Sequence, residues 1–141
     1  MNKNKIGLIR VIIAIVILAF VLIAFVIIGK KGIKAELLED SIVVTAFLFD
    51  EKVSYDNVES VELCDNIDYG RRSFGVGTFQ IKSGNFHNDR FGDYKLAITE
   101  ASTNCIVIKI LGGSYLVFNQ KSNQDTNDFY TKLIQKVPVI K

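Results

Sequence analysis

The chain carries one long apolar stretch near its N-terminus, Val11–Ile28, with no polar side chain in 18 positions. At about 1.5 Å of rise per residue, a helix of this length spans roughly 27 Å, close to the ~30 Å hydrocarbon core of a bilayer. A helix also satisfies its own backbone hydrogen bonds, as lipid requires. The pattern predicts a membrane anchor over residues 1–31. Its spanning positions include Val11, Ile15, Leu18, Leu22, Phe25 and Ile28.

Two other interpretations of this stretch are a cleaved signal peptide and a buried core helix. The apolar part of a signal peptide runs about 7–15 residues and ends at a small-residue cleavage site. This run is longer and passes from Phe25 to Lys30 without such a site. A core helix of this length normally shows a polar stripe. We therefore favour an uncleaved, single-pass anchor in the cell membrane.

Basic residues flank the apolar stretch equally, three on each side. They are Lys3, Lys5 and Arg10 before it, and Lys30, Lys31 and Lys34 after it. Lys and Arg in short loops favour the cytoplasmic side of a membrane. Because the two flanks tie, their charges leave open the side on which the rest of the chain lies.

After the anchor, short runs of alternating or continuous apolar residues predict about seven strands. These runs cover residues 34–39, 42–49, 58–64, 78–83, 94–99, 105–111 and 115–118. Turn residues separate most of the runs, at 50–52, 84–85, 92–93 and 112–114, and residues 65–77 form the longest irregular segment. Glycines that suit tight connections are Gly75, Gly77, Gly84 and Gly92.

The period then changes to that of an amphipathic helix. Ser122 and Asp125 resemble a capping box, and Pro138 ends the pattern. Between them, apolar residues recur three or four positions apart, at Phe129, Tyr130, Leu133, Ile134 and Val137. The whole pattern predicts a mainly β (α+β) domain over residues 34–138. A bent antiparallel barrel of about seven strands would be capped by the C-terminal helix.

Several segments resemble those of bacterial pleckstrin-homology (PH) domain proteins. They are Arg72-Ser-Phe-Gly75-Val-Gly77-Thr78, Gly84-Asn-Phe86, Cys105–Leu111 and Tyr115–Asn119 leading into the helix. Phe79 departs from the pattern, since many relatives would carry Pro there. The resemblance implies a PH-like fold beside a membrane segment. It implies no ligand, because bacterial members generally lack the phosphoinositide-binding basic loop of their eukaryotic counterparts.

Charge argues against nucleic acid as a partner. The formal net charge is +2, but three of the 17 basic residues precede the apolar stretch. The rest of the chain therefore contains 14 basic and 15 acidic residues and is close to neutral. A nucleic-acid-binding domain needs a basic face.

The two cysteines, Cys64 and Cys105, lie in strand-like runs and are expected to be buried free thiols. A single bridge between them is the alternative in an oxidising compartment.

Nothing in the chain predicts catalysis, a metal or a cofactor. His87 is the only histidine, and pairing it with a buried cysteine would not make an active nucleophile. The acidic pairs Asp65/Asp68 and Asp89/Asp93 lack calcium-loop spacing. Gly75-x-Gly77 is followed by neither Lys-Ser/Thr nor a helix, so it is no phosphate loop.

The densest basic group is Arg71, Arg72 and Arg90. Facing a bilayer, each would contribute about 1 kcal/mol of attraction to anionic lipid. The favoured alternative is structural, with Arg72 paired to Asp65 or Asp68 across the long loop. These three arginines are nevertheless the candidate surface-binding residues.

The sequence thus favours a non-enzymatic membrane protein. The helix would contact the bilayer, and the domain would bind a protein or peptide at the edge of its sheet or beside its helix. A protective (immunity) factor against a membrane-active peptide and a weak anionic-lipid-binding module are the alternatives. An enzyme is the least favoured class.

Overall fold

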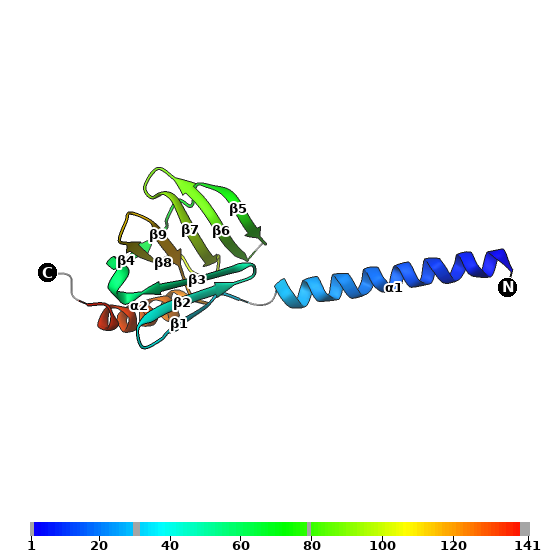
Figure 1. The fold of residues 1–141 in the computed structure, drawn as a ribbon, viewed down its shortest axis with the longest axis horizontal. Helices are drawn as coiled ribbons and strands as arrows, with labels where there is room; N and C mark the ends of the chain where they lie inside the picture. Colours follow the sequence, from blue (N-terminus) through cyan, green and yellow to red (C-terminus); the bar gives the residue numbers. More distant parts are fainter. Residues whose placement is uncertain (1, 30–31, 79, 139–141) are drawn as a thin grey trace. The chain divides into compact units, whose positions relative to one another are not determined.

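The computed structural model describes residues 2–29, 32–78 and 80–138 (Figure 1). The chain forms two compact units, residues 1–31 and 32–141. The first unit is helix α1, Lys3–Gly29. Its stretch Asn4–Ile27 is long and apolar enough to cross a membrane, and none of it is buried in the protein. A signal sequence near an N-terminus meets the same criteria.

The predicted spanning positions lie on this helix, and the side chains of Val11, Ile15, Leu18, Leu22 and Phe25 are exposed. Ile28 also belongs to α1, but its side chain lies outside the described residues. Lys30 and Lys31, the predicted end of the anchor, also lie outside them. The membrane crossing itself stays a prediction.

The second unit contains nine strands and a C-terminal helix. The strands are β1 Lys34–Leu37, β2 Ser41–Ala46, β3 Phe49–Ser54, β4 Val58–Asp65, β5 Arg71–Gly77, β6 Ile81–Asn88, β7 Gly92–Thr99, β8 Asn104–Ile110 and β9 Tyr115–Phe118. A short 3₁₀ turn, η1 (Tyr55–Asn57), separates β3 from β4, and the helix is α2, Asn123–Lys136. The mainly β fold with a helix at each end confirms the predicted fold class.

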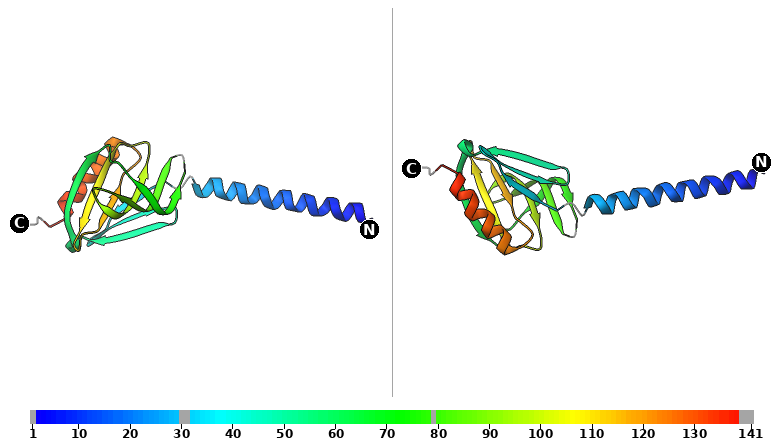
Figure 2. Two further views of the ribbon diagram at one scale, coloured as in Figure 1. Left: turned by 90° about the horizontal axis from the view of Figure 1, so that it is seen from above. Right: turned by 90° about the horizontal axis from the view of Figure 1, so that it is seen from below.

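The strands form two sheets rather than one closed barrel (Figure 2). The small sheet has the order β1-β2-β3 and the large sheet the order β4-β8-β9-β7-β6-β5. All pairings are antiparallel except that of β9 with β7, which is parallel. The β8–β9 hairpin therefore lies between two strands that precede it in the sequence.

The predicted strand over residues 42–49 contains a turn of its own. β2 ends at Ala46, β3 begins at Phe49, and Leu48 takes a positive φ of 53° with its side chain 77% exposed. The prediction of a turn at residues 50–52 is therefore wrong, because these residues belong to β3. A bulky residue with positive φ is uncommon, and the apolar run offers no turn signal.

The region of the predicted turn glycines also differs from expectation. Gly75 and Gly84 lie inside β5 and β6 as direct partners, with φ of 133° and 134°. A Cβ on Gly84 would lie 2.1 Å from the carbonyl oxygen of Phe74, so the two backbones approach too closely for a side chain. Gly77 ends β5, whereas Gly92 follows a turn and begins β7. Phe79 lies outside the described residues.

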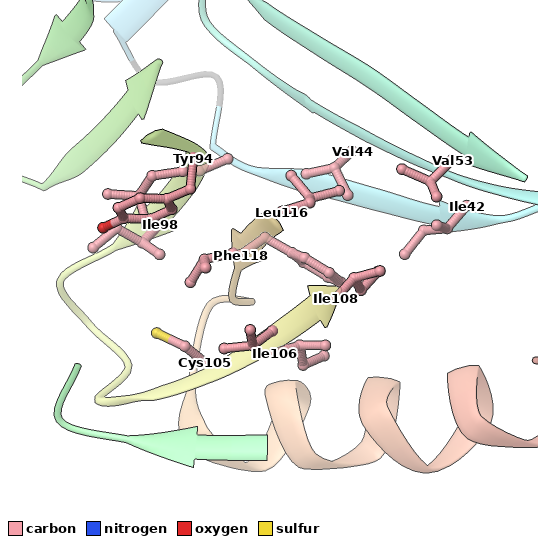
Figure 3. Close-up of a cluster of buried hydrophobic side chains, with 14 of the residues drawn as sticks. Ile42, Val44, Val53, Tyr94, Ile98, Cys105, Ile106, Ile108, Leu116 and Phe118 are labelled. Carbon is pink, nitrogen blue, oxygen red and sulfur yellow. The ribbon is translucent and has the colours of Figure 1, made fainter. Parts of the chain in front are cut away.

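The hydrophobic core lies between the two sheets and beneath α2 (Figure 3). Ile42 and Val44 of the small sheet point toward Leu116 and Ile108 of the large sheet. The fully buried apolar residues are Ile42, Val44, Leu96, Ala97, Ile98, Cys105, Ile106, Ile108, Val117, Phe118 and Leu133. Helix α2 packs against β8 and β4 of the large sheet.

The predicted helix cap is confirmed. The Ser122 side chain accepts a hydrogen bond from the backbone N–H of Asp125 at 3.1 Å and donates to its Oδ2 at 2.8 Å. The helix ends at Lys136, two residues before Pro138. We expect Ser122→Ala to lower the free energy of unfolding by about 1 kcal/mol, because an N-terminal N–H loses its acceptor. Urea denaturation measures this change, and Ser122→Thr, which keeps the hydroxyl, should retain most of the stability.

Candidate functional site

The three candidate arginines do not form one cluster. Arg90 is already engaged, since its Nη2 lies 3.1 Å from Glu62 Oε2 and its guanidinium lies 4.9 Å from the centre of the Phe91 ring. The same Nη2 lies 3.5 Å from the Sγ of Cys64. The side chain of Arg90 therefore links the turn between β6 and β7 to strand β4, and its charge is already paired with that of Glu62.

Arg71 and Arg72 differ from Arg90 because both are exposed and neither forms an ion pair within the described residues. The favoured pairing of Arg72 with Asp65 or Asp68 is therefore wrong. Asp68 instead braces the loop locally, accepting the Gly70 N–H at its Oδ1 over 2.9 Å. The start of β5 thus carries two positive charges that have no ion-pair partner among the residues the structure describes.

Strand β5 is the outermost strand of the large sheet. Its inner edge pairs with β6, and no described residue forms a backbone hydrogen bond with its outer edge. Only Val76 of its seven residues is half-buried, whereas Phe74 is 74% exposed. An unpaired edge is a template for another strand. β5 therefore offers free backbone groups, two cations and one large apolar side chain together.

A β-bulge shapes this strand at Ser73, where the register shifts between Arg72 and Phe74. The Ser73 hydroxyl donates to the carbonyl oxygen of Asn85 on β6 at 3.1 Å. Bulges bend a strand and redirect its side chains. Ser73 also borders a cavity of about 450 Å³.

This cavity extends from β5 across the large sheet to the β8–β9 hairpin. Its lining includes Asn85, Tyr94, Tyr115, Leu116 and the ion pair between Lys95 and Glu51. The mixture of aromatic, apolar and charged groups suits a side chain of a bound molecule. The edge strand and the cavity together form the candidate site.

The residues considered for catalysis are not assembled into a nucleophilic site. His87 Nδ1 lies 2.7 Å from Asp93 Oδ1 at the surface, and neither cysteine is among its hydrogen-bond partners in the described chain. Cys105 is fully buried, and burial raises the pKa of its thiol to about 11. Burial likewise raises the pKa of Tyr69 and of Tyr94. The described residues contain no group of three His, Cys, Asp or Glu suited to a metal.

Sequence reasoning identified Arg71 and Arg72 but missed the strand that carries them. The segment RRSFGVG has two glycines, two charges and little alternation, so it resembles a loop. Exposed Phe74 among polar neighbours was the one available signal of a surface contact.

The comparisons with known proteins agree with this architecture. No curated protein and no solved structure matches the chain significantly. The model of the bacterial PH domain family matches residues 33–137, which include all nine strands and helix α2. Because this match covers more than half of the chain, the protein belongs to the bacterial PH domain family.

Proposed function

We propose that this protein is a non-enzymatic interaction module, anchored in a membrane by α1, that binds an extended segment of a partner protein along β5. The observation that carries the proposal is the outer edge of β5, with which no described residue pairs, together with its exposed side chains. PH domains are often interaction modules and are generally non-catalytic, which supports the class of function.

The backbone of β5 supplies the binding energy in this proposal. An added peptide strand pairs its N–H and C=O groups with those of an exposed sheet edge, and alternate side chains provide specificity. The bulge at Ser73 bends the strand there, so a bound segment would pair along only part of it. The adjoining cavity would then receive one side chain of the peptide.

The side chains of β5 indicate the chemistry of the bound segment. Arg71 and Arg72 have no acidic partner within the described chain, so acidic residues on the peptide would pair with them. Phe74 is exposed and would contact an apolar residue. An anchor in the membrane would keep the module near membrane partners, which allows a weak contact to be occupied.

Arg71 and Arg72 are consecutive strand residues and point to opposite faces of the sheet. The test therefore uses the full chain in nanodiscs and a labelled peptide that carries a Glu-Glu pair between Val residues, followed by fluorescence anisotropy. We expect Arg71→Glu with Arg72→Glu to weaken binding about tenfold, because attraction at both positions becomes repulsion. The matched control is Lys121→Glu with Lys132→Glu, which changes the same charge at exposed positions outside the site. It should leave the affinity unchanged.

A peptide N-methylated at alternate residues separates strand pairing from simple charge attraction. It keeps its carboxylates but loses the backbone donors that pair with β5, so it should not bind measurably. Equal binding of both peptides would overturn strand addition. Nanodiscs of anionic and of neutral lipid distinguish the lipid-binding alternative, in which the arginine variants alter only the association with anionic lipid. The protective-factor alternative stays a hypothesis.

A further inference from the structure

The two cysteines lie directly opposite each other in the large sheet. Cys64 of β4 and Cys105 of β8 are Cα partners within a register that runs without a break from Ser60/Lys109 to Asp65/Asn104. Directly opposite residues of an antiparallel pair place their side chains on the same face of the sheet. The fold therefore brings together two thiols that lie about forty residues apart in the sequence.

The separation of the two residues follows from the geometry of the ladder. The Cα atoms of directly opposite residues in an antiparallel pair lie about 4.5–5.5 Å apart. Both limits fall inside the Cα separation of about 4.4–6.8 Å that a disulfide requires. The register therefore places Cys64 and Cys105 at a distance that a disulfide can bridge.

Strand β4 can adjust to close the remaining distance. Opposite Cβ atoms lie about 4.5–5.5 Å apart, whereas a disulfide needs about 3.5–4.5 Å. β4 is the outermost strand on its side of the sheet, and its register already shifts between Val58 and Ser60. Strand β4 can therefore move by about 1 Å toward β8 without disturbing a second neighbouring strand.

The two thiols have different surroundings. Cys105 is buried, with the Tyr69 hydroxyl 3.9 Å and the Asn119 Nδ2 4.0 Å from its Sγ. Cys64 is only half-buried, and Arg90 Nη2 lies 3.5 Å from its Sγ. Glu62 Oε2 lies 3.8 Å from the same Sγ, and the guanidinium of Arg90 offers a positive charge to an anionic oxidant. Because Cys64 is half-buried and Cys105 is buried, a solvent-borne oxidant meets Cys64 first.

We propose that Cys64 and Cys105 form a reversible thiol-oxidation site, in which Cys64 captures a small-molecule disulfide and Cys105 resolves the adduct. The Cys64 thiolate attacks one sulfur of the oxidant, forms a mixed disulfide and releases one thiolate. Cys105 then loses its proton to solvent and attacks Cys64 Sγ, and the second thiolate leaves. In total, two protein thiols and one small-molecule disulfide give one Cys64–Cys105 bridge and two small-molecule thiols.

This proposal does not depend on peptide binding at β5, since neither cysteine borders that site. The high pKa of Cys105, raised to about 11 by burial, makes the second step slower at neutral pH than at pH 9. Burial and the high pKa together also disfavour a direct attack of Cys105 on an external oxidant.

The test treats the full chain in detergent micelles with oxidised glutathione and traps free thiols with N-ethylmaleimide before peptide mass mapping. The wild-type chain should show a Cys64–Cys105 linked peptide that dithiothreitol reverses. Cys64→Ser should leave Cys105 as a free thiol. Cys105→Ala should stop at glutathione on Cys64, and circular dichroism checks that this variant folds.

A second pair of variants tests the role of the neighbouring cation. Arg90→Gln should slow the first step several-fold, whereas Lys121→Gln, an exposed control, should leave its rate unchanged. A wild-type chain that accumulates mixed disulfide with Cys105 still free would overturn the proposal. So would a bridge that forms only after urea is added, because it would then belong to the unfolded chain.

Discussion

Gly84→Ala is expected to lower the free energy of unfolding by about 3 kcal/mol and the melting temperature by more than about 10 °C. The added methyl group meets backbone rather than a flexible side chain, with the Phe74 carbonyl oxygen at 2.1 Å and the Gly75 Cα at 2.6 Å. It would also impose an L side chain on a φ of 134°. Strand β5 must separate from β6 to accommodate it. Thermal denaturation followed by circular dichroism measures the loss.

Two control glycines separate the causes of this effect. Gly92 has a φ of 66° but open space around its Cβ position, so Gly92→Ala measures backbone conformation without a clash. Gly32 has neither a positive φ nor a neighbour within 4 Å, and Gly32→Ala should be close to neutral. A loss for Gly84→Ala no larger than that for Gly92→Ala would show that the strands do not approach as closely as described.

Asn119→Leu is expected to lower the free energy of unfolding by about 4 kcal/mol. Asn119 is fully buried, and its Nδ2 donates to the carbonyl oxygens of Thr99 at 2.9 Å and Ser102 at 3.1 Å. Its Oδ1 accepts the Thr99 N–H at 2.7 Å. Leucine has the same branched arrangement of side-chain heavy atoms but leaves these backbone groups without their partner. Urea denaturation of the variant checks the prediction.

The control for this substitution is Asn85→Leu, an equal chemical change on the exposed surface of β6. It should alter stability by less than about 0.5 kcal/mol. Asn119→Asp adds a second comparison, because it keeps an acceptor for Thr99 but loses both donors. An Asn119→Leu chain as stable as the wild type would mean that the loop around Ser102 rearranges to recover its hydrogen bonds.

The elements with regular local patterns were predictable from the sequence. Val11–Ile28 is continuously apolar and forms a helix, and the Ser122 cap begins α2 as its spacing indicated. Strand β9 has the predicted bounds, because the turn at residues 112–114 separates it clearly from β8. In these segments local propensity and burial agree.

The rest of the fold depends on contacts between distant segments. Leu48 makes its turn with no glycine, and Gly84 acts inside a strand because Gly75 lies opposite it. Neither fact is visible in a window of ten residues. The parallel pairing of β9 with β7 is equally hidden, since alternation indicates a strand but not its neighbour.

The candidate site was also only partly predictable from the sequence. Sequence composition singled out the arginines, but only the fold shows that Arg90 pairs with Glu62, 28 positions away. Arg71 and Arg72 have no such partner in the part of the chain that the structure describes. The opposition of Cys64 and Cys105 likewise requires the β4–β8 register. Sequence reasoning therefore named most of the relevant side chains without their relationships.

The order of strands in the large sheet also has a consequence for how the protein is made. Synthesis releases β4 and β7 from the ribosome before β8 and β9, which must lie between them. Until then β4 lacks its neighbour and β7 pairs only with β6. Such late, long-range pairing slows folding and exposes unpaired strands and core residues to aggregation. Co-translational folding of the domain thus stays incomplete until Phe118 has emerged, an interval in which chaperones would protect the nascent chain.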